Sequence, residues 1–159
     1  QKTAYFSEKF LEITVPVTTK EQIKEIKKTV THIAKKHDEE PYKALATTQQ
    51  AIFHQLEEQD EIDAAAIFDK VFEEKPLARE AAQLAITEER VPEKIAVTNV
   101  PKYERKYSKQ KFKLDNGIEI TIPSEIYENK EMVEFINNPD GSVSVLIKNI
   151  ESILNKFNA

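Results

Sequence analysis

Apolar side chains in residues 1–90 recur at helical spacing. After Thr18 they return every three or four positions, which is typical of one face of an amphipathic helix. Thr18 and Glu21 form a capping box, whose side chains satisfy N–H groups that a helix start leaves without partners. The sequence therefore predicts a helix that begins here. Its apolar stripe consists of Ile23, Ile26, Val30, Ile33 and His37.

Three further stretches continue the helical pattern. Pro41 and Pro76 each open a stretch, and proline is tolerated in a first helical turn because its missing N–H would have no partner there. Asp60 is predicted to cap the helix between these two, and the last helix to end near Glu89. Four helices with short connections predict an antiparallel helical layer. The predicted inward positions are Tyr42, Leu45, Gln49, Ile52, Phe53 and Leu56, then Ala64, Ile67, Phe68, Val71 and Phe72, then Leu77, Ala81, Leu84 and Ala85.

From about residue 110 the apolar period falls to two, which is typical of strands. A two-residue turn would send the apolar residues of the two strands to opposite faces. A three-residue loop over 115–117 instead sets Leu114 opposite Ile118 and Phe112 opposite Ile120, so that one apolar face forms. We therefore predict the three-residue loop, with its glycine in the left-handed region.

A second hairpin follows from the same test. Residues 139–141, Pro-Asp-Gly, are a strong turn signal. A three-residue loop sets Phe135 opposite Val145 and Val133 opposite Ile147, which again gives one apolar face. The chain therefore predicts two hairpins in succession.

Three shorter segments complete the pattern. Residues 4–15 are apolar, end at Pro16 and fit a short helix or a strand equally well. Residues 123–127 predict a short helical turn between the hairpins. Residues 151–157 fit either a final short helix or a frayed tail.

These elements predict an α+β protein. A helical part spans residues 1–90, and a hairpin part spans residues 91–159, where two β-hairpins form a small antiparallel sheet. A pair of hairpins needs another layer to cover its apolar face. We therefore expect the two parts to share one core.

Composition narrows the chemistry. The chain has 159 residues and no cysteine, so disulfides, thiolate nucleophiles and cysteine-bound zinc are excluded, in agreement with a reducing compartment. Its apolar runs fall far short of the roughly 20 residues that span a bilayer. No signal peptide opens the sequence. We expect a cytoplasmic protein with no membrane contact.

Neither a catalytic nor a metal site is predicted. His32 and His37 would lie about 140° apart around a helix, so they share no face. The acidic residues 57–63 lack the glycine and ligand spacing of a calcium loop and fit charge at a helix start better. No serine stands in a nucleophile motif. We predict a protein that is not an enzyme and that needs no cofactor.

The basic residues concentrate in one stretch. Residues 1–90 hold 13 Lys and Arg against 18 Asp and Glu, whereas residues 93–113 hold seven basic residues against two acidic ones. On an extended strand the last three lysines would project from one face, opposite Phe112. Such a row suits phosphates, but lysines on an edge strand also prevent aggregation. We call the candidate nucleic-acid-binding residues the basic strip: Lys102, Arg105, Lys106, Lys109, Lys111 and Lys113.

The hairpin sequences carry a family resemblance. Residues 112–123 (FKLDNGIEITIP) and 135–150 (FINNPDGSVSVLIKNI) resemble the end of the bacterial 37-kDa nucleoid-associated protein family, and the opening Tyr5-Phe6 with Phe10-Leu11 is similar to the middle of those proteins. The chain begins at Gln1 rather than Met. We therefore expect it to be the C-terminal half of a longer protein.

The resemblance implies a function. Members of this family associate with the bacterial nucleoid in the cytoplasm and bind double-stranded DNA without enzymatic activity. The alternative is a protein-interaction or dimerisation module with no DNA contact of its own, which the acidic balance of residues 1–90 would suit. Its partner would then be a second copy or another protein.

Overall fold

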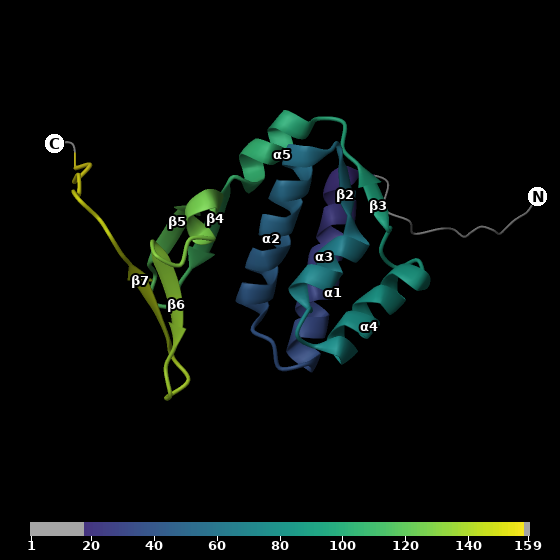
Figure 1. Ribbon diagram of the computed structural model, residues 1–159, viewed down its shortest axis with the longest axis horizontal. Helices are drawn as coiled ribbons and strands as arrows, with labels where there is room; N and C mark the ends of the chain where they lie inside the picture. The colour runs from purple at the N-terminus through teal and green to yellow at the C-terminus, as the bar shows by residue number, and fades with distance from the viewer. Residues whose placement is uncertain (1–17, 158–159) are drawn as a thin grey trace, which may run out of the picture. The chain divides into compact units, whose positions relative to one another are not determined.

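The computed structural model describes residues 18–157, so the predicted segment 4–15 lies outside the described residues. Within them the predicted α+β class is confirmed, with six helices and three antiparallel strand pairs (Figure 1). The chain divides into two compact units, Gln1–Glu104 and Arg105–Ala159. That the helical and hairpin parts share one core stays a prediction.

The first helix begins where the capping box predicts. Helix α1 spans Thr19–Lys36, and the Thr18 hydroxyl oxygen accepts a hydrogen bond from the Glu21 N–H at 3.1 Å. The same hydroxyl donates to the Glu21 carboxylate at 2.7 Å. All four aliphatic positions of the predicted stripe are buried: Ile23, Ile26, Val30 and Ile33.

Three more helices complete the helical part of the first unit. Helices α2 (Pro41–Glu58) and α4 (Pro76–Thr87) open with the two predicted first-turn prolines, and α3 spans Ala64–Val71. Helix α1 packs against α2 and α4, and α3 packs against the same two helices. The four predicted helices are therefore confirmed, and their buried side chains form the core of this unit.

The predicted cap of α3 was wrong. Asp63, not Asp60, accepts the capping hydrogen bond, from the N–H of Ala66 at 3.1 Å. The residues in between form strand β2 (Glu61–Asp63), which pairs with β3 (Lys94–Ala96). Ile62 and Ile95 face each other in this pair and are fully buried. Burial of Ile62 in the core keeps residues 61–63 in a strand, so the helix begins only at Ala64.

The predicted inward face of α4 was also mostly wrong. Leu77 is 70% exposed and Leu84 is 50% exposed, whereas Ala78, Ala82 and Ala85 are buried. Helix–helix distance depends on the side chains at the contact, so small alanines let α4 approach α1 and α3 closely. Hydrophobicity alone favoured the leucines, but packing distance selects the alanines.

The second unit contains both predicted hairpins. Strand β4 (Lys109–Lys113) pairs with β5 (Glu119–Pro123), and β6 (Val133–Asn137) pairs with β7 (Val143–Ile147). Each hairpin is a two-stranded sheet, and helix α6 (Ser124–Tyr127) joins them. The predicted helical turn between the hairpins is thus confirmed.

Both predicted registers are confirmed. Phe112 faces Ile120 in the first hairpin, and Phe135 faces Val145 in the second. Gly117 has a φ of 95° and Gly141 has a φ of 92°, the left-handed region that the three-residue loops require. In the second turn the Ser142 hydroxyl and N–H donate to the carboxylate of Asp140, which lowers the pKa of Asp140.

Three aromatic rings connect the hairpins with α6. The ring centroid of Phe112 lies 5.0 Å from that of Phe135 and 5.8 Å from that of Tyr127. Tyr127 and Phe135 are 5.8 Å apart in an edge-on arrangement, which aromatic pairs favour. Burial in this cluster raises the pKa of the Tyr127 hydroxyl.

We expect Phe135→Ala to lower the pKa of Tyr127 toward its ordinary value. Removing the ring lets water reach the phenol, and desolvation is the cause of the raised value. A pH titration of the Tyr127 Cζ signal by NMR measures this change. Phe157→Ala is the control, because Phe157 is exposed in the last described residues. An unchanged Tyr127 midpoint in Phe135→Ala would contradict the role of the cluster.

Candidate nucleic-acid interface

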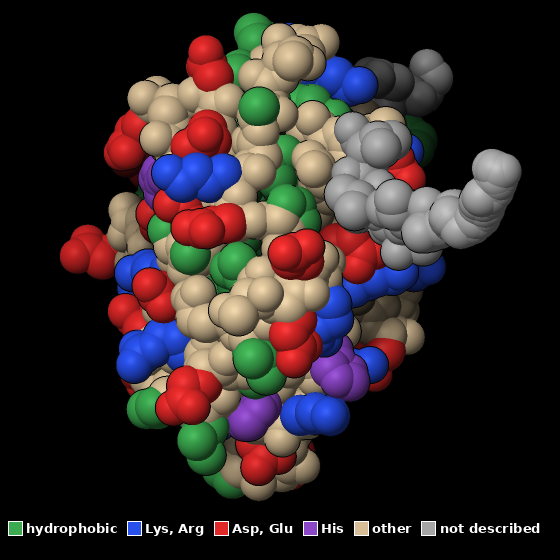
Figure 2. Space-filling view, turned by 90° about the vertical axis from the view of Figure 1, so that its right-hand side faces the viewer, with side chains coloured by type: hydrophobic (Ala, Val, Ile, Leu, Met, Phe, Trp, Pro, Cys, Tyr) green, Lys and Arg blue, Asp and Glu red, His purple; other side chains and the backbone are tan. Residues whose placement is uncertain are grey.

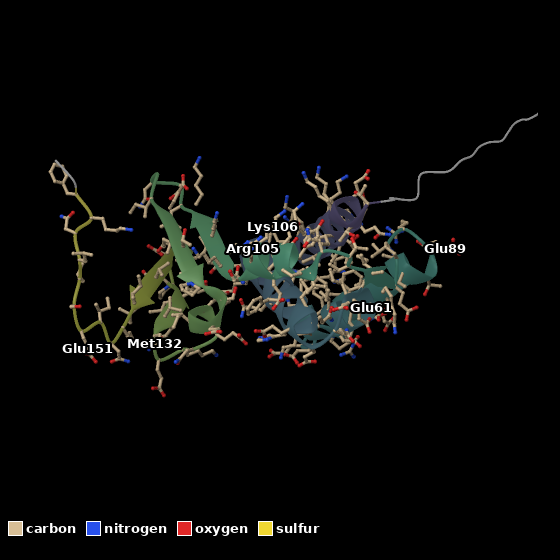
Figure 3. The ribbon with its side chains drawn as sticks, turned by 90° about the horizontal axis from the view of Figure 1, so that it is seen from above. Glu61, Glu89, Arg105, Lys106, Met132 and Glu151 are labelled. Atoms are coloured by element: carbon tan, nitrogen blue, oxygen red, sulfur yellow. The ribbon has the colours of Figure 1, made fainter. Side chains whose placement is uncertain are left out.

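Helix α5 (Val100–Tyr107) carries the first three residues of the basic strip. Lys102, Arg105 and Lys106 are all exposed, and their i, i+3, i+4 spacing is that of one helix face. Figure 3 labels Arg105 and Lys106 on this helix. The boundary between the two units falls inside this helix, so Lys102 belongs to the first unit and the other five strip residues to the second.

Two tyrosines alternate with these cations. The Lys102 ammonium lies 5.6 Å from the ring centroid of Tyr103, and the Lys106 ammonium lies 5.8 Å from that of Tyr107. Both distances fall within the range of a cation–π contact. The tyrosine rings therefore hold two of the cations close to the helix surface.

The last turn of α5 is fastened to the hairpin that follows. Ser124 is buried, and its hydroxyl donates to the Tyr107 carbonyl at 2.7 Å while its N–H donates to the Ser108 carbonyl at 2.8 Å. The Ser108 hydroxyl in turn donates to the Arg105 carbonyl at 2.7 Å. These bonds fix Arg105 and the start of β4 relative to each other.

Strand β4 presents the remaining three residues as a row. Lys109, Lys111 and Lys113 are exposed, whereas Gln110 is buried and Phe112 is half-buried. This is the alternation that the sequence predicts. Side chains two apart on a strand point to the same face, so the three ammonium groups share one side of the hairpin.

The paired strand β5 adds one countercharge to this face. Lys113 lies opposite Glu119, whereas Lys111 lies opposite Thr121 and Lys109 opposite Pro123. Directly opposite residues are within reach of each other across an antiparallel pair. Glu119 therefore offsets charge at the Lys113 end of the row, whereas Lys111 and Lys109 face uncharged residues of β5.

Helix α5 itself was not predicted from the sequence, and neither were two contacts of the site. Glu119 faces Lys113, a pairing that the predicted register implies. Ser124 anchors α5 by bonding 17 residues back along the chain, and a lone serine in a short turn gives no sequence signal for this. Glu119 lowers the net positive charge of the lysine face, and Ser124 fixes the end of α5 against the first hairpin.

The other parts of the described structure are weaker candidates for a binding site. Among residues 18–157 no group of three or more His, Cys, Asp or Glu side chains could hold a metal ion. The helices in this range are all too short or too polar to cross a bilayer. Acidic and basic side chains mix on the face that Figure 2 shows. A pocket beside α4 is lined by residues that include Asp69, Leu77, Arg79, Glu80 and Leu84.

We expect Ser124→Ala to destabilise the second unit by about 1–3 kcal/mol, because a buried hydrogen bond to the Tyr107 carbonyl is lost. Urea unfolding followed through the amide NMR signals of β4 and β5 measures the loss. Ser152→Ala is the matched control, since Ser152 is exposed, and its effect should stay within about 0.5 kcal/mol. Equal stability of the two variants would refute the anchoring role.

Comparison with known families gives one match. A family model described as NA37, Nucleoid-associated protein YejK, matches residues 1–155, which is essentially the whole chain. Comparison with curated proteins found no match, and comparison with solved structures found none.

Proposed function

The chain belongs to the family of the nucleoid-associated protein YejK, and from that premise we propose that it binds double-stranded DNA through the basic strip. The contacts are salt-sensitive and go to the phosphate backbone. The protein acts at the nucleoid, in the cytoplasm, as a binding protein rather than an enzyme. The observation that carries the proposal is the exposed lysine row on β4 beside Arg105 and Lys106.

The spacing of the row suits a phosphate backbone. Successive lysines on one face of a strand lie roughly 6.6–6.8 Å apart. Phosphates along one strand of DNA also form a regular row of charges, one for about every 3.4 Å of helix axis. Because lysine stems are flexible, Lys109, Lys111 and Lys113 can each reach a phosphate of the same backbone.

The residue types favour binding that tolerates different DNA sequences. Five of the six strip residues are lysines, whose ammonium is a point charge on a flexible stem. Base recognition depends on hydrogen bonds to base edges, and arginine is the commonest side chain that makes them in a bidentate manner. A lysine row supplies charge neutralisation instead, with release of counterions from the DNA.

The charge balance confines the contact to this strip. Residues 1–90 have 13 basic against 18 acidic residues, so the helical part repels a polyanion overall. Residues 93–113 have seven basic residues against Glu93 and Glu104. Exposed charges are screened beyond about 10 Å at 0.1 M salt, so a local cluster can bind DNA on a protein with net charge −5.

We expect the triple variant Lys106→Glu, Lys109→Glu, Lys111→Glu to weaken binding to duplex DNA by more than about tenfold at low salt. Loss of three phosphate contacts should reduce the slope of log affinity against log salt by about 3, since each contact contributes about 0.9. Fluorescence anisotropy with a labelled duplex across a salt series measures both quantities.

A control with the same charge change separates local from global effects. Lys24, Lys27 and Lys28 are exposed on α1, and reversing all three to glutamate changes the net charge equally. We expect this control to leave the slope unchanged. Equal losses in the two triple variants would show that only total charge matters. Unchanged binding in the strip variant would remove the strip from the function.

A second function is favoured by a separate observation. The last described residues expose Ile150, Ile153, Leu154 and Phe157, which suits contact with a protein surface. In this alternative the chain is an interaction or dimerisation module of a nucleoid-associated protein. It would then bind no duplex DNA at any salt concentration in the anisotropy experiment.

A further inference from the structure

The outer edge of β7 lacks the usual protection of an edge strand. Its five residues, Val-Ser-Val-Leu-Ile, contain neither charge nor proline. Val143 is 40% exposed, Leu146 is 44% exposed and Ile147 is 53% exposed. Strand β4 differs, because it carries a lysine at every second position. Natural edge strands carry such charges to prevent pairing with other chains, so β7 is an open template for a further strand.

The backbone of β7 is ready for that strand. Asn138 donates its N–H to the Ser142 carbonyl, and Lys148 donates its N–H to the Met132 carbonyl, both at 2.8 Å. In an antiparallel pair only every second residue bonds to the neighbouring strand. Ser142 and Lys148 bond to the β6 side, so the even-numbered residues of β7 between them also bond to β6. The N–H and C=O groups of Val143, Val145 and Ile147 therefore point to the outer edge, where the described sheet has no further strand.

We propose that β7 pairs with β7 of a second copy, antiparallel and about a two-fold axis through Val145. In this register Val143 faces Ile147 of the partner subunit, and Ile147 faces the partner's Val143. The outward N–H and C=O groups of all three residues then exchange hydrogen bonds across the axis. The arrangement is self-complementary, as a two-fold interface requires.

Charge and side-chain chemistry favour this occupant. Self-pairing of β7 brings no like charges together, because the strand has none. Lys148, the next residue, is already engaged by Glu134 of β6, with its ammonium 3.2 Å from the carboxylate. The facing Val143 and Ile147 side chains form apolar cross-strand pairs, which stabilise antiparallel sheets.

The tail that follows β7 extends the exposed apolar surface of the pairing edge. A standard interface buries about 800 Å² on each partner, more than a five-residue strand supplies. The chain beyond β7 forms neither helix nor strand up to residue 157 (Figure 1). It exposes four more large apolar side chains. This tail continues directly from the pairing edge. Together, β7 and the tail offer a second copy more apolar surface than the strand alone.

Two double variants test the register by sedimentation velocity of the whole chain over a concentration series. The wild type is expected to pass from monomer to dimer. Val143→Lys with Ile147→Lys places two lysines face to face on each side of the axis, so the dissociation constant should rise at least about 100-fold. Val143→Lys with Ile147→Glu places opposite charges face to face instead, so dimerisation should persist.

Both variants change the same two exposed positions, and amide NMR spectra show whether the hairpin is intact in each. A wild type that stays monomeric at all concentrations overturns the proposal, and so do double variants that both dimerise or both remain monomeric with intact hairpins. The readout is independent of DNA, so failure here leaves the function of the basic strip standing, and failure of DNA binding leaves this interface standing.

Discussion

A two-stranded hairpin is only marginally stable in water, and the second unit depends on the aromatic contact that overcomes this. The rings of Phe112, Tyr127 and Phe135 lie 5.0–5.8 Å apart and join β4, α6 and β6. The two hairpins thereby contact each other through apolar side chains. Phe112 alternates with the lysines of β4, so the contact that turns this ring inward also turns the lysine row outward.

The aromatic contact also determines which side of β4 is exposed in the second unit. With the aromatic side buried, the outward side of β4 is available for charge, and Ser124 holds the last turn of α5 against the start of that strand. In the proposed function the lysines attract phosphates, and on an edge strand they also prevent pairing with other chains. Strand β7 has no such charge, which is consistent with an edge that a second copy covers.

Local patterns predicted most of the fold. The capping box, both first-turn prolines and the period-two alternation act within a few residues, and one-sided burial fixed both hairpin registers, including the left-handed Gly117. Features that depend on long-range contacts were not predicted by these local patterns. Ile62 becomes strand because Ile95, far along the chain, pairs with it, and α4 turns alanines inward because close packing outweighs the hydrophobicity of Leu77. The exposure of Lys109, Lys111 and Lys113 followed from alternation. Helix α5, which carries the other three residues of the strip, and the anchor Ser124 did not follow from the sequence.

The most direct test of the central claim is to titrate an arbitrary duplex into the isotopically labelled chain at low salt and to follow its amide NMR signals. DNA contact through the basic strip predicts that the largest shifts fall on residues 105–113, that they reverse on adding salt, and that duplexes of unrelated sequence give the same set. Shifts confined to α1–α4, or no shifts at all, would contradict the account.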